Sequence, residues 1–307
     1  MSHASQSPPL RGRCPAGQRG VSPVITRRAF LGGLALASFG GSPAIAETRP
    51  RRVVCLEWTS AEMVISLGIT PIAVGDIRGY RDWVVEPQLP ASVMDLGSRS
   101  EPNLELLAEL QPDLIVGAYG YGLDANDFIR FAPVFNIPFY DGTSSPYAQA
   151  VAETRRLGTV LDRERQADQL ITNVENSIAQ ARTKLAPRAA RPLCVVSMFD
   201  DRHVRVYGAG SLFQDVMDRL GLANAWVRPT TDWGFAQAGI EELVSIGDAT
   251  LISLDPIPRH VQIRIDNSSL WNNLPCVRNG KVIRIAPVWP FGALLAAQRF
   301  AALLANI

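Results

Sequence analysis

The segment Asn103–Val116 reads NLELLAELQPDLIV, and it aligns without gaps on Gly239–Ile252, which reads GIEELVSIGDATLI. In both segments a polar or glycine residue precedes a helix-period run, and a turn then leads into an apolar run typical of a buried strand. A shorter pair, Glu62–Gly68 and Asp215–Gly221, ends in Leu-Gly in both places. Because the two pairs occur in the same order, the sequence predicts two related α/β lobes.

Short apolar runs alternate with helix-period segments along the rest of the chain, as expected for α/β layers. We expect strands at Val53–Leu56, Pro71–Gly75, Val93–Leu96, Leu114–Gly117, Val134–Tyr140, Leu193–Met198, Val204–Tyr207, Leu251–Leu254 and Val282–Ile285. We expect helices at Leu104–Leu110, Ala148–Leu161, Glu164–Leu185 and Gly292–Asn306. A capping box at Thr59–Glu62 predicts one more helix, which stops at Gly68.

The predicted helix at Glu164–Leu185 is long, polar and free of glycine, with a single stripe of apolar residues at helical spacing. A helix with one buried face suits a strut that joins two lobes. We therefore divide the chain into an export signal at residues 1–46, an N-terminal lobe at 47–148, a helical segment with the interlobe helix at 149–188, and a C-terminal lobe at 189–307.

The N-terminal residues are typical of a twin-arginine export signal. Arg27 and Arg28 precede Phe30 and a short apolar run, and Ala44–Ala46 supplies a small-x-small cleavage site. The alternative is a basic helix followed by a short core segment. The apolar run is too short to span a bilayer, and no cysteine follows it for lipid attachment. We expect a soluble protein that acts outside the cytoplasm and begins near Glu47.

Charge and composition argue against nucleic-acid binding. The chain carries 30 Lys and Arg against 29 Asp and Glu, and residues 1–46 hold five arginines and no acid, so the processed form is 25 minus 29, or −4. A nucleic-acid binder needs a clustered basic face. After processing only His203 and His260 remain, too few for a multi-histidine metal site. Cys55 and Cys194 lie in apolar runs, so buried free thiols are the default interpretation, and pairing with Cys276 stays open.

Loop aromatic residues point to a ligand cleft rather than to an enzyme. In open α/β sheets ligands bind beyond the carboxyl ends of strands, where Arg99 and Tyr121 fall, together with tryptophans in predicted loops. These tryptophans are Trp83, Trp226, Trp233 and Trp289. Indole faces beside a guanidinium and a phenol suit a wide amphipathic cleft, although any single tryptophan could simply cover a lobe edge. No GxSxG, HExxH or phosphate-loop motif is present.

Seven segments in order carry a resemblance to a known family. They are Arg52–Trp58, Tyr80–Trp83, Gly97–Glu105, Gly120–Gly122, Ser211–Gln214, Asn224–Trp226 and Ala286–Trp289. Together they resemble the periplasmic ferric-hydroxamate (ferrichrome-type) siderophore-binding proteins of ABC importers, over essentially the whole chain. The wider family also includes vitamin B12 and haem binders. The resemblance implies a periplasmic protein with two lobes joined by one long helix, a shallow cleft between the lobes and little closure on binding.

The resemblance also implies roles for individual residues. Arg99 and Tyr121 would donate to the iron-bound hydroxamate oxygens. The aromatic wall would comprise Trp83, Trp233 and Trp289, with Trp226 nearby and Phe291 where relatives often have tyrosine. We expect the Trp289 ring to contribute to the wall and little to stability. The residues around Trp233 (Thr231, Asp232 and Phe235) also depart from relatives, which leaves the particular siderophore open.

These roles agree with the chemistry of the ligand. A tris-hydroxamate gives iron(III) six oxygen ligands, so we expect the protein to bind no cofactor directly and to carry iron inside the siderophore. A guanidinium and a phenol suit the oxygen cluster, and indoles suit the organic shell. The alternatives are a haem or cobalamin carrier of the same architecture and, less favoured, a periplasmic enzyme.

The internal repeat points to a membrane partner. Glu105 and Glu241 each follow an expected N-cap, Asn103 or Gly239, by two residues, off the apolar stripe. An acid near a helix N-terminus interacts favourably with the helix dipole, which by itself is a sufficient explanation. The resemblance implies instead that one acid per lobe docks on an ABC permease in the inner membrane. We expect a monomer that docks through these two residues.

Overall fold

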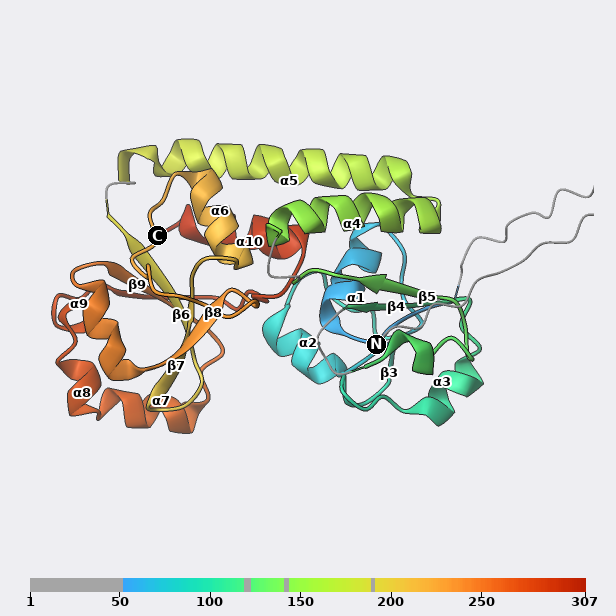
Figure 1. The fold of residues 1–307 in the computed structure, drawn as a ribbon, viewed down its shortest axis with the longest axis horizontal. Coiled ribbons are helices and arrows are strands. Elements are labelled where there is room, and N and C mark those ends of the chain that lie inside the picture. The colour runs from blue at the N-terminus through green and yellow to red at the C-terminus, as the bar shows by residue number, and fades with distance from the viewer. Residues whose placement is uncertain (1–51, 119–122, 141–143, 189–190) are drawn as a thin grey trace, which may run out of the picture. The chain divides into compact units, whose positions relative to one another are not determined.

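The computed structural model describes residues 52–118, 123–140, 144–188 and 191–307 (Figure 1). Thr48–Ile307 forms one compact unit. The expected export signal, with Arg27 and Arg28, lies outside the described residues, and so does Tyr121. Within the described residues no helix is both long and apolar enough to cross a membrane.

Ten strands and ten α-helices, with three short 3₁₀ helices, make up the described part of the chain. The strands are β1 (Val53–Cys55), β2 (Ala73–Val74), β3 (Met94–Asp95), β4 (Leu114–Ala118), β5 (Val134–Ile137), β6 (Leu193–Met198), β7 (His203–Tyr207), β8 (Phe235–Gly239), β9 (Thr250–Leu254) and β10 (Val282–Ile285). The α-helices are α1 (Trp58–Ser66), α2 (Ile77–Trp83), α3 (Leu104–Leu110), α4 (Pro146–Leu161), α5 (Glu164–Leu185), α6 (Leu212–Leu220), α7 (Arg259–Asp266), α8 (Ser269–Asn272), α9 (Pro275–Arg278) and α10 (Leu294–Leu304). The 3₁₀ helices are η1 (Ala125–Asp127), η2 (Ala186–Arg188) and η3 (Ile240–Ile246).

The strands form two five-stranded sheets with matching positions. The N-terminal sheet has the order β3-β2-β1-β4-β5 and is parallel throughout, and the C-terminal sheet has the order β10-β9-β6-β7-β8. In the C-terminal sheet β7 is antiparallel to both of its neighbours, so β8 runs parallel to β6 and β9. The two-lobed α/β fold predicted from the sequence is confirmed.

The longer internal repeat is confirmed by this topology. Helix α3 leads into β4, and η3 leads into β9, and each of these strands lies beside the central strand of its sheet, β1 or β6. The later copy forms a 3₁₀ helix instead of an α-helix. The shorter repeat is wrong, because α1 joins the first and second strands of its lobe whereas α6 joins the second and third.

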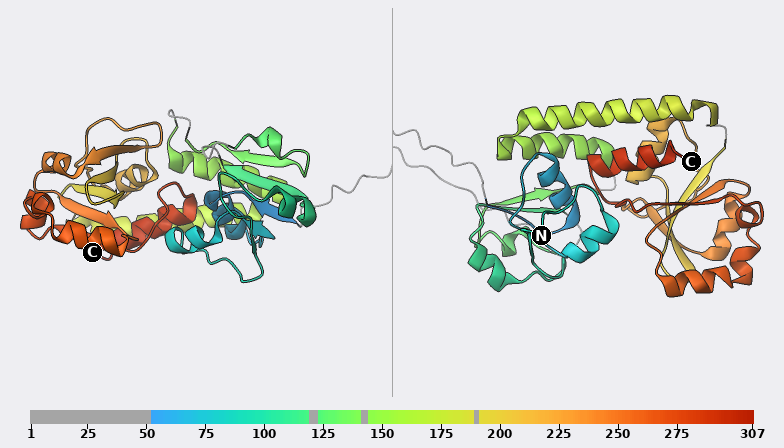
Figure 2. Two further views of the ribbon diagram at one scale, coloured as in Figure 1. Left: turned by 90° about the horizontal axis from the view of Figure 1, so that it is seen from below. Right: turned by 180° about the vertical axis from the view of Figure 1, so that it is seen from behind.

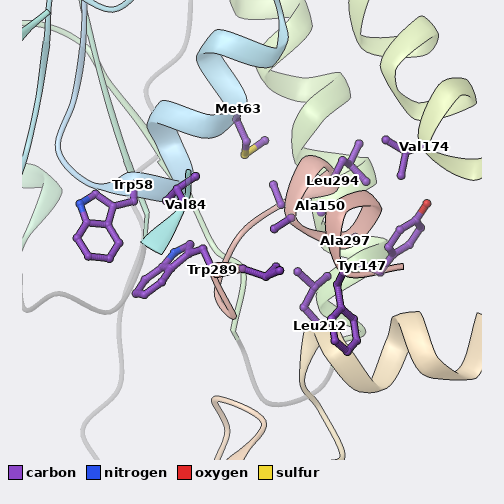
Figure 3. Packing of buried hydrophobic residues seen from close by; sticks show 14 of the residues in the cluster. Trp58, Met63, Val84, Tyr147, Ala150, Val174, Leu212, Trp289, Leu294 and Ala297 are labelled. Carbon is purple, nitrogen blue, oxygen red and sulfur yellow. The ribbon is translucent and has the colours of Figure 1, made fainter. Parts of the chain in front are cut away.

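Helix α5 spans Glu164–Leu185 as predicted, with one buried stripe that includes Ala167, Ile171, Val174 and Ile178. It lies against α4, α6 and α10 (Figures 1 and 2). Because α4 follows the N-terminal sheet and α6 and α10 belong to the C-terminal half, the buried face of α5 packs on helices from both halves of the chain. Figure 3 shows this continuous core, in which Met63 of α1, Leu294 of α10 and Leu212 of α6 belong to one cluster.

The predicted capping box at the start of α1 is wrong. The N-cap is Glu57, whose carboxylate accepts from the backbone N–H groups of Thr59 and Ser60 at 2.6 and 2.5 Å. The helix thus begins two residues earlier than expected. Glu62 takes no part in this cap and contacts α10 instead. Gly68 follows the C-cap with φ of +80°, a conformation that glycine adopts without strain.

Several elements of the fold were missed. Trp83 was expected to lie in a loop, but Asp76 adopts a left-handed conformation and caps α2 by accepting from Gly79 N–H at 3.0 Å. Strand β8 lacks the β-branched residues on which the other strand predictions relied. The described cysteines Cys55, Cys194 and Cys276 are buried free thiols, as expected for the first two.

Candidate ligand-binding site

Arg99 lies over aromatic rings just beyond strand β3. Its guanidinium carbon is 3.4 Å from the centroid of Trp58 and 5.4 Å from that of Trp289, and its Nε is 3.7 Å from a carboxylate oxygen of Asp76. The side chain remains partly exposed. Stacking on indole and the carboxylate of Asp76 help to position the guanidinium, whose planar fork suits anionic oxygens.

Close backbone approaches explain how this arrangement forms. A Cβ on Gly79 would lie 2.2 Å from an atom of the Trp58 ring, and a Cβ on Gly75 would lie 2.3 Å from Leu56 O. The Trp58 ring can therefore pack this closely against α2 only because residue 79 is glycine. Trp58 Nε1 also donates to Asp76 O at 2.9 Å, which fixes the indole under Arg99.

Seven aromatic side chains form a continuous series of ring contacts, which we call the aromatic wall. Its members are Trp58, Trp83, Tyr140, Trp233, Phe235, Trp289 and Phe291. Trp289 is 4.6 Å from Trp58, 6.4 Å from Trp83 and 5.2 Å from Phe291 between ring centroids. Phe291 is also 5.5 Å from Trp233. The wall therefore combines rings from both halves of the chain.

Trp289 does more than contribute to the wall. The residue is only 7% exposed, and its Nε1 donates to Thr59 Oγ1 at 3.1 Å. The same hydroxyl donates to Phe291 O at 2.8 Å, and Tyr140 donates to Pro290 O at 3.2 Å. The segment from Trp289 to Phe291 is thereby tied to the N-terminal half. The expectation that the Trp289 ring contributes little to stability is wrong, because the indole is part of the core.

Two other tryptophans differ from expectation. Trp83 is the last residue of helix α2 rather than part of a loop, although its ring does join the wall. Trp226 lies apart from the wall, because it is 4% exposed and packs in a separate core cluster beneath the C-terminal sheet. The guanidinium carbon of Arg228 lies 5.0 Å from the centroid of its ring. The structure thus brings together Arg99, Trp83, Trp233, Trp289 and Phe291 but not Trp226.

Three members of the wall were missed as site candidates. Trp58 and Tyr140 each follow the end of a strand, β1 or β5, by three residues, so the strand-end rule could have found both. Tyr140 stacks on Trp233 with ring centroids 5.0 Å apart. Phe235 begins β8, which was not predicted as a strand.

A cavity of about 420 Å³ is lined in part by Tyr140 of the wall and by Asp232, the residue before Trp233. Hydroxyl and carboxylate groups line it, among them those of Ser145, Asp215 and Asp232. Asp215 accepts from Ser145 Oγ at 2.7 Å and from Tyr147 N–H at 2.9 Å, so it links the start of α6 to the start of α4. The wall therefore has a polar recess beside Tyr140.

Two buried carboxylates stabilise the starts of helices next to the site. Glu57 caps α1, and burial raises its pKa above the usual range. Glu62 is 1% exposed and accepts from the backbone N–H groups of Ala293, Leu295 and Ala296 at the start of α10. Burial raises the pKa of Glu62 to about 7, with a smaller contribution from the charge of Glu57, while the three N–H donors act in the opposite direction.

The acids at the two repeated helix starts are exposed at equivalent places. Asn103 and Gly239 are the N-caps as predicted, and Glu105 and Glu241 lie in the first turns of α3 and η3. Helix α3 follows β3 and η3 follows β8, and each of these strands runs parallel to the central strand of its sheet. Both acids therefore lie at the carboxyl ends of the parallel strands. A cavity of about 770 Å³ lies beside Glu241.

Comparison with known proteins defines the class. Residues 53–288 match the family of periplasmic binding proteins. The iron(3+)-hydroxamate-binding protein FhuD of Escherichia coli K12 is 36% identical over 287 residues, which cover 92% of this chain and 97% of that protein. The Fe(3+)-citrate-binding protein YfmC of Bacillus subtilis is 24% identical and covers 76% of this chain. The chain therefore belongs to the periplasmic binding protein family.

Solved structures agree with this assignment. The Fe3+–Desferal-bound siderophore-binding protein FhuD of Vibrio cholerae has a TM-score of 0.79 and 29% identity, and the match covers 83% of this chain and 97% of that one. Staphylococcus aureus SirA, at 19% identity and a TM-score of 0.62, shows the same fold. The two-lobed architecture is thus that of siderophore-binding members of the family.

Proposed function

We propose that this protein captures ferric hydroxamate siderophores in the periplasm and presents them to an ABC permease for iron uptake. The observation that carries the proposal is the aromatic wall with Arg99 stacked on it. Membership of the periplasmic binding protein family supports a role in binding and transport rather than catalysis. The 36% identity to an iron(3+)-hydroxamate-binding protein supports the ligand class.

The chemistry of the site suits this ligand. A tris-hydroxamate surrounds iron(III) with oxygens, so the protein contacts the ligand's oxygens and its organic shell rather than the metal. Arg99 offers charge-assisted hydrogen bonds to those oxygens. The half-buried rings of Trp83, Trp233 and Phe291 offer apolar faces to the shell. We retain Tyr121, which lies outside the described residues, as a second donor, and leave out Trp226 because it is core.

Export and delivery complete the proposal. Residues 1–46 act as a twin-arginine signal, and the processed protein works as a monomer. Glu105 and Glu241 contact the permease, one from each lobe. Their exposure and their matching positions in the two sheets support this role. Haem and cobalamin carriers share the architecture, but a stacked guanidinium favours an oxygen-rich anionic ligand over either macrocycle.

The absorption spectrum of the desalted protein tests the ligand class. The purified protein is incubated separately with ferric desferrioxamine, ferrichrome, haemin and cyanocobalamin and is then desalted. We expect the ferric-hydroxamate charge-transfer band to travel with the protein and intrinsic tryptophan fluorescence to be quenched. Retention of haemin or cobalamin without either hydroxamate would contradict the proposal.

A further inference from the structure

Arg205 is a second arginine beside the aromatic wall, on the C-terminal side. It lies in the middle of β7, paired with Ser197 of β6 and Gln237 of β8. Because side chains alternate along a strand, Arg205 shares a sheet face with Tyr207, while Val204 and Val206 point into the opposite core cluster. Tyr207 is the cross-strand partner of Phe235, so Arg205 is on the wall's side of the sheet.

Ring contacts connect Arg205 to the wall. Its guanidinium carbon is 5.0 Å from the centroid of Phe235 and 5.6 Å from that of Phe199. Phe235 is in turn 6.0 Å from Phe291, which is in contact with Trp289. Arg205 thus adjoins the Phe235 end of the wall, as Arg99 adjoins the Trp58 end.

The polar surroundings of Arg205 are incomplete. Its Nε is buried and has no hydrogen-bond partner among the residues that the structure describes. In that part of the chain no carboxylate forms an ion pair with Arg205 either. A buried guanidinium nitrogen without an acceptor is unfavourable and calls for an explanation. The residue as a whole is partly exposed, so the rest of the guanidinium can be reached from outside.

We propose that Arg205 is a second guanidinium contact of the ligand, donating to its oxygens from the C-terminal lobe while Arg99 donates from the N-terminal lobe. The inference rests on the proposed function, since it names a further residue of the same site. Two guanidinium groups at opposite ends of one aromatic surface can donate to the iron–oxygen cluster of one ligand from two sides, while the rings between them contact its organic shell.

Binding of ferric desferrioxamine to the full chain tests the role of Arg205. Arg205→Met keeps the aliphatic stem on Phe235 but removes the donors, and we expect it to weaken binding about 10- to 100-fold. Arg205→Lys keeps the charge without the planar fork, so its affinity should lie between those of the wild type and of Arg205→Met. The matched control is Arg284→Met on β10 of the same sheet, whose guanidinium pairs with Asp255. The control should bind as the wild type does.

Melting temperature separates a binding role from a structural one. The ligand-free Arg205→Met protein should melt no lower than the wild type, because a buried donor without an acceptor is removed. Wild-type affinity in Arg205→Met, while the wild type itself binds, would overturn the inference and leave the proposed function standing. Failure of the wild type to bind would overturn both. If the Met variant does not fold, the Lys variant decides: weaker binding at an unchanged melting temperature supports the contact, and wild-type affinity overturns it.

Discussion

Glu62 accepts a hydrogen bond of 3.0 Å from the backbone N–H of Leu295, which lies 233 residues further along the chain. Ala293 and Ala296 donate to the same carboxylate, so a side chain of α1 supplies acceptors for the free N–H groups at the start of α10. The contact is buried and crosses between the two halves of the chain. Glu62 therefore caps the start of α10 and also links α1 to α10 through buried hydrogen bonds.

Glu62 should make stability depend on pH. The folded protein holds this proton up to a pKa of about 7, whereas an unfolded glutamate loses it near 4.5. Between these values the folded state binds more protons, so the free energy of unfolding should fall as pH rises, by on the order of 3 kcal/mol. Chemical denaturation at pH 5 and pH 8 measures this, and Glu62→Gln should reduce the difference, while Glu57, whose pKa burial also raises, keeps a contribution of the same sign.

The exposed Glu109 is the control for this experiment, since Glu109→Gln removes a carboxyl group that does not cap another helix. That variant should keep the wild-type pH dependence. A Glu62→Gln protein with the same slope as the wild type would mean that Glu62 is ionised in the folded protein over the whole range.

Arg99→Ala should weaken ferric-hydroxamate binding about 10- to 150-fold, because a hydrogen bond to a charged group contributes about 1.5–3 kcal/mol. Quenching of tryptophan fluorescence measures the affinity. Arg81→Ala is the control, an exposed arginine on the neighbouring helix α2. Unchanged affinity in Arg99→Ala would remove Arg99 from the site.

Trp289 and Trp233 should respond differently to truncation. Trp289 is buried and hydrogen-bonded to Thr59, so Trp289→Ala should lower the free energy of unfolding by about 3–5 kcal/mol. Trp233 is only half-buried, stacked on Tyr140, so Trp233→Ala should cost about 2 kcal/mol of binding and much less stability. Thermal melts and ligand titrations of both variants separate the roles. Equal losses of stability in the two would contradict the distinction.

Glu105→Ala combined with Glu241→Ala should leave siderophore affinity unchanged and abolish uptake in cells, because both acids are exposed and each would dock one lobe on the permease. Radiolabelled iron uptake and in vitro titration measure the two properties.

The control for docking has to be chosen with care. Glu242 is unsuitable, because it accepts from Gly239 N–H at 3.0 Å and pairs with Arg228. Glu109→Ala with Glu164→Ala is better, since both are exposed and Glu164 is also a first-turn acid, in α5. Normal uptake by the Glu105/Glu241 double variant, or equal loss in both double variants, would contradict two-point docking.

Changing Arg27 and Arg28 together to lysine should leave folded precursor in the cytoplasm, because the export receptor reads the guanidinium forks and not charge alone. Cell fractionation and immunoblotting measure the precursor. Ordinary export of the double-lysine protein would indicate the general secretion route instead.

Local patterns predicted those elements of the fold that local forces determine. The bounds of α3, α5, β6 and β10 were predicted to the residue, because each has a strong period or a mostly apolar run. The start of α1 was misplaced because Thr59 and Glu62 have the spacing of a capping box. The competing partners of Glu62 lie in α10, and no pattern within α1 contains that information.

The site was predicted in part for a similar reason. Arg99 and Trp289 follow the carboxyl ends of β3 and β10, so the strand-end rule located both. The burial of Trp289 depends on Thr59, which is far away in sequence. Trp226 was misplaced because a tryptophan in a loop can equally cover a core, as it does beneath the C-terminal sheet. Arg205 escaped notice because its significance depends on its position beside Phe235 and on its buried Nε, which has no hydrogen-bond partner within the described parts of the chain.

The contacts of Glu62 and Thr59 with the last part of the chain also affect how the permease can sense its cargo. Rotating one half against the other would break buried hydrogen bonds in two places, beside α10 and at Trp289. We therefore expect loaded and empty proteins to have nearly the same outline. A membrane partner then cannot recognise cargo by a closed shape. It has to distinguish the two forms through the surface of the siderophore itself, or through how strongly the ligand restrains small motions of the wall.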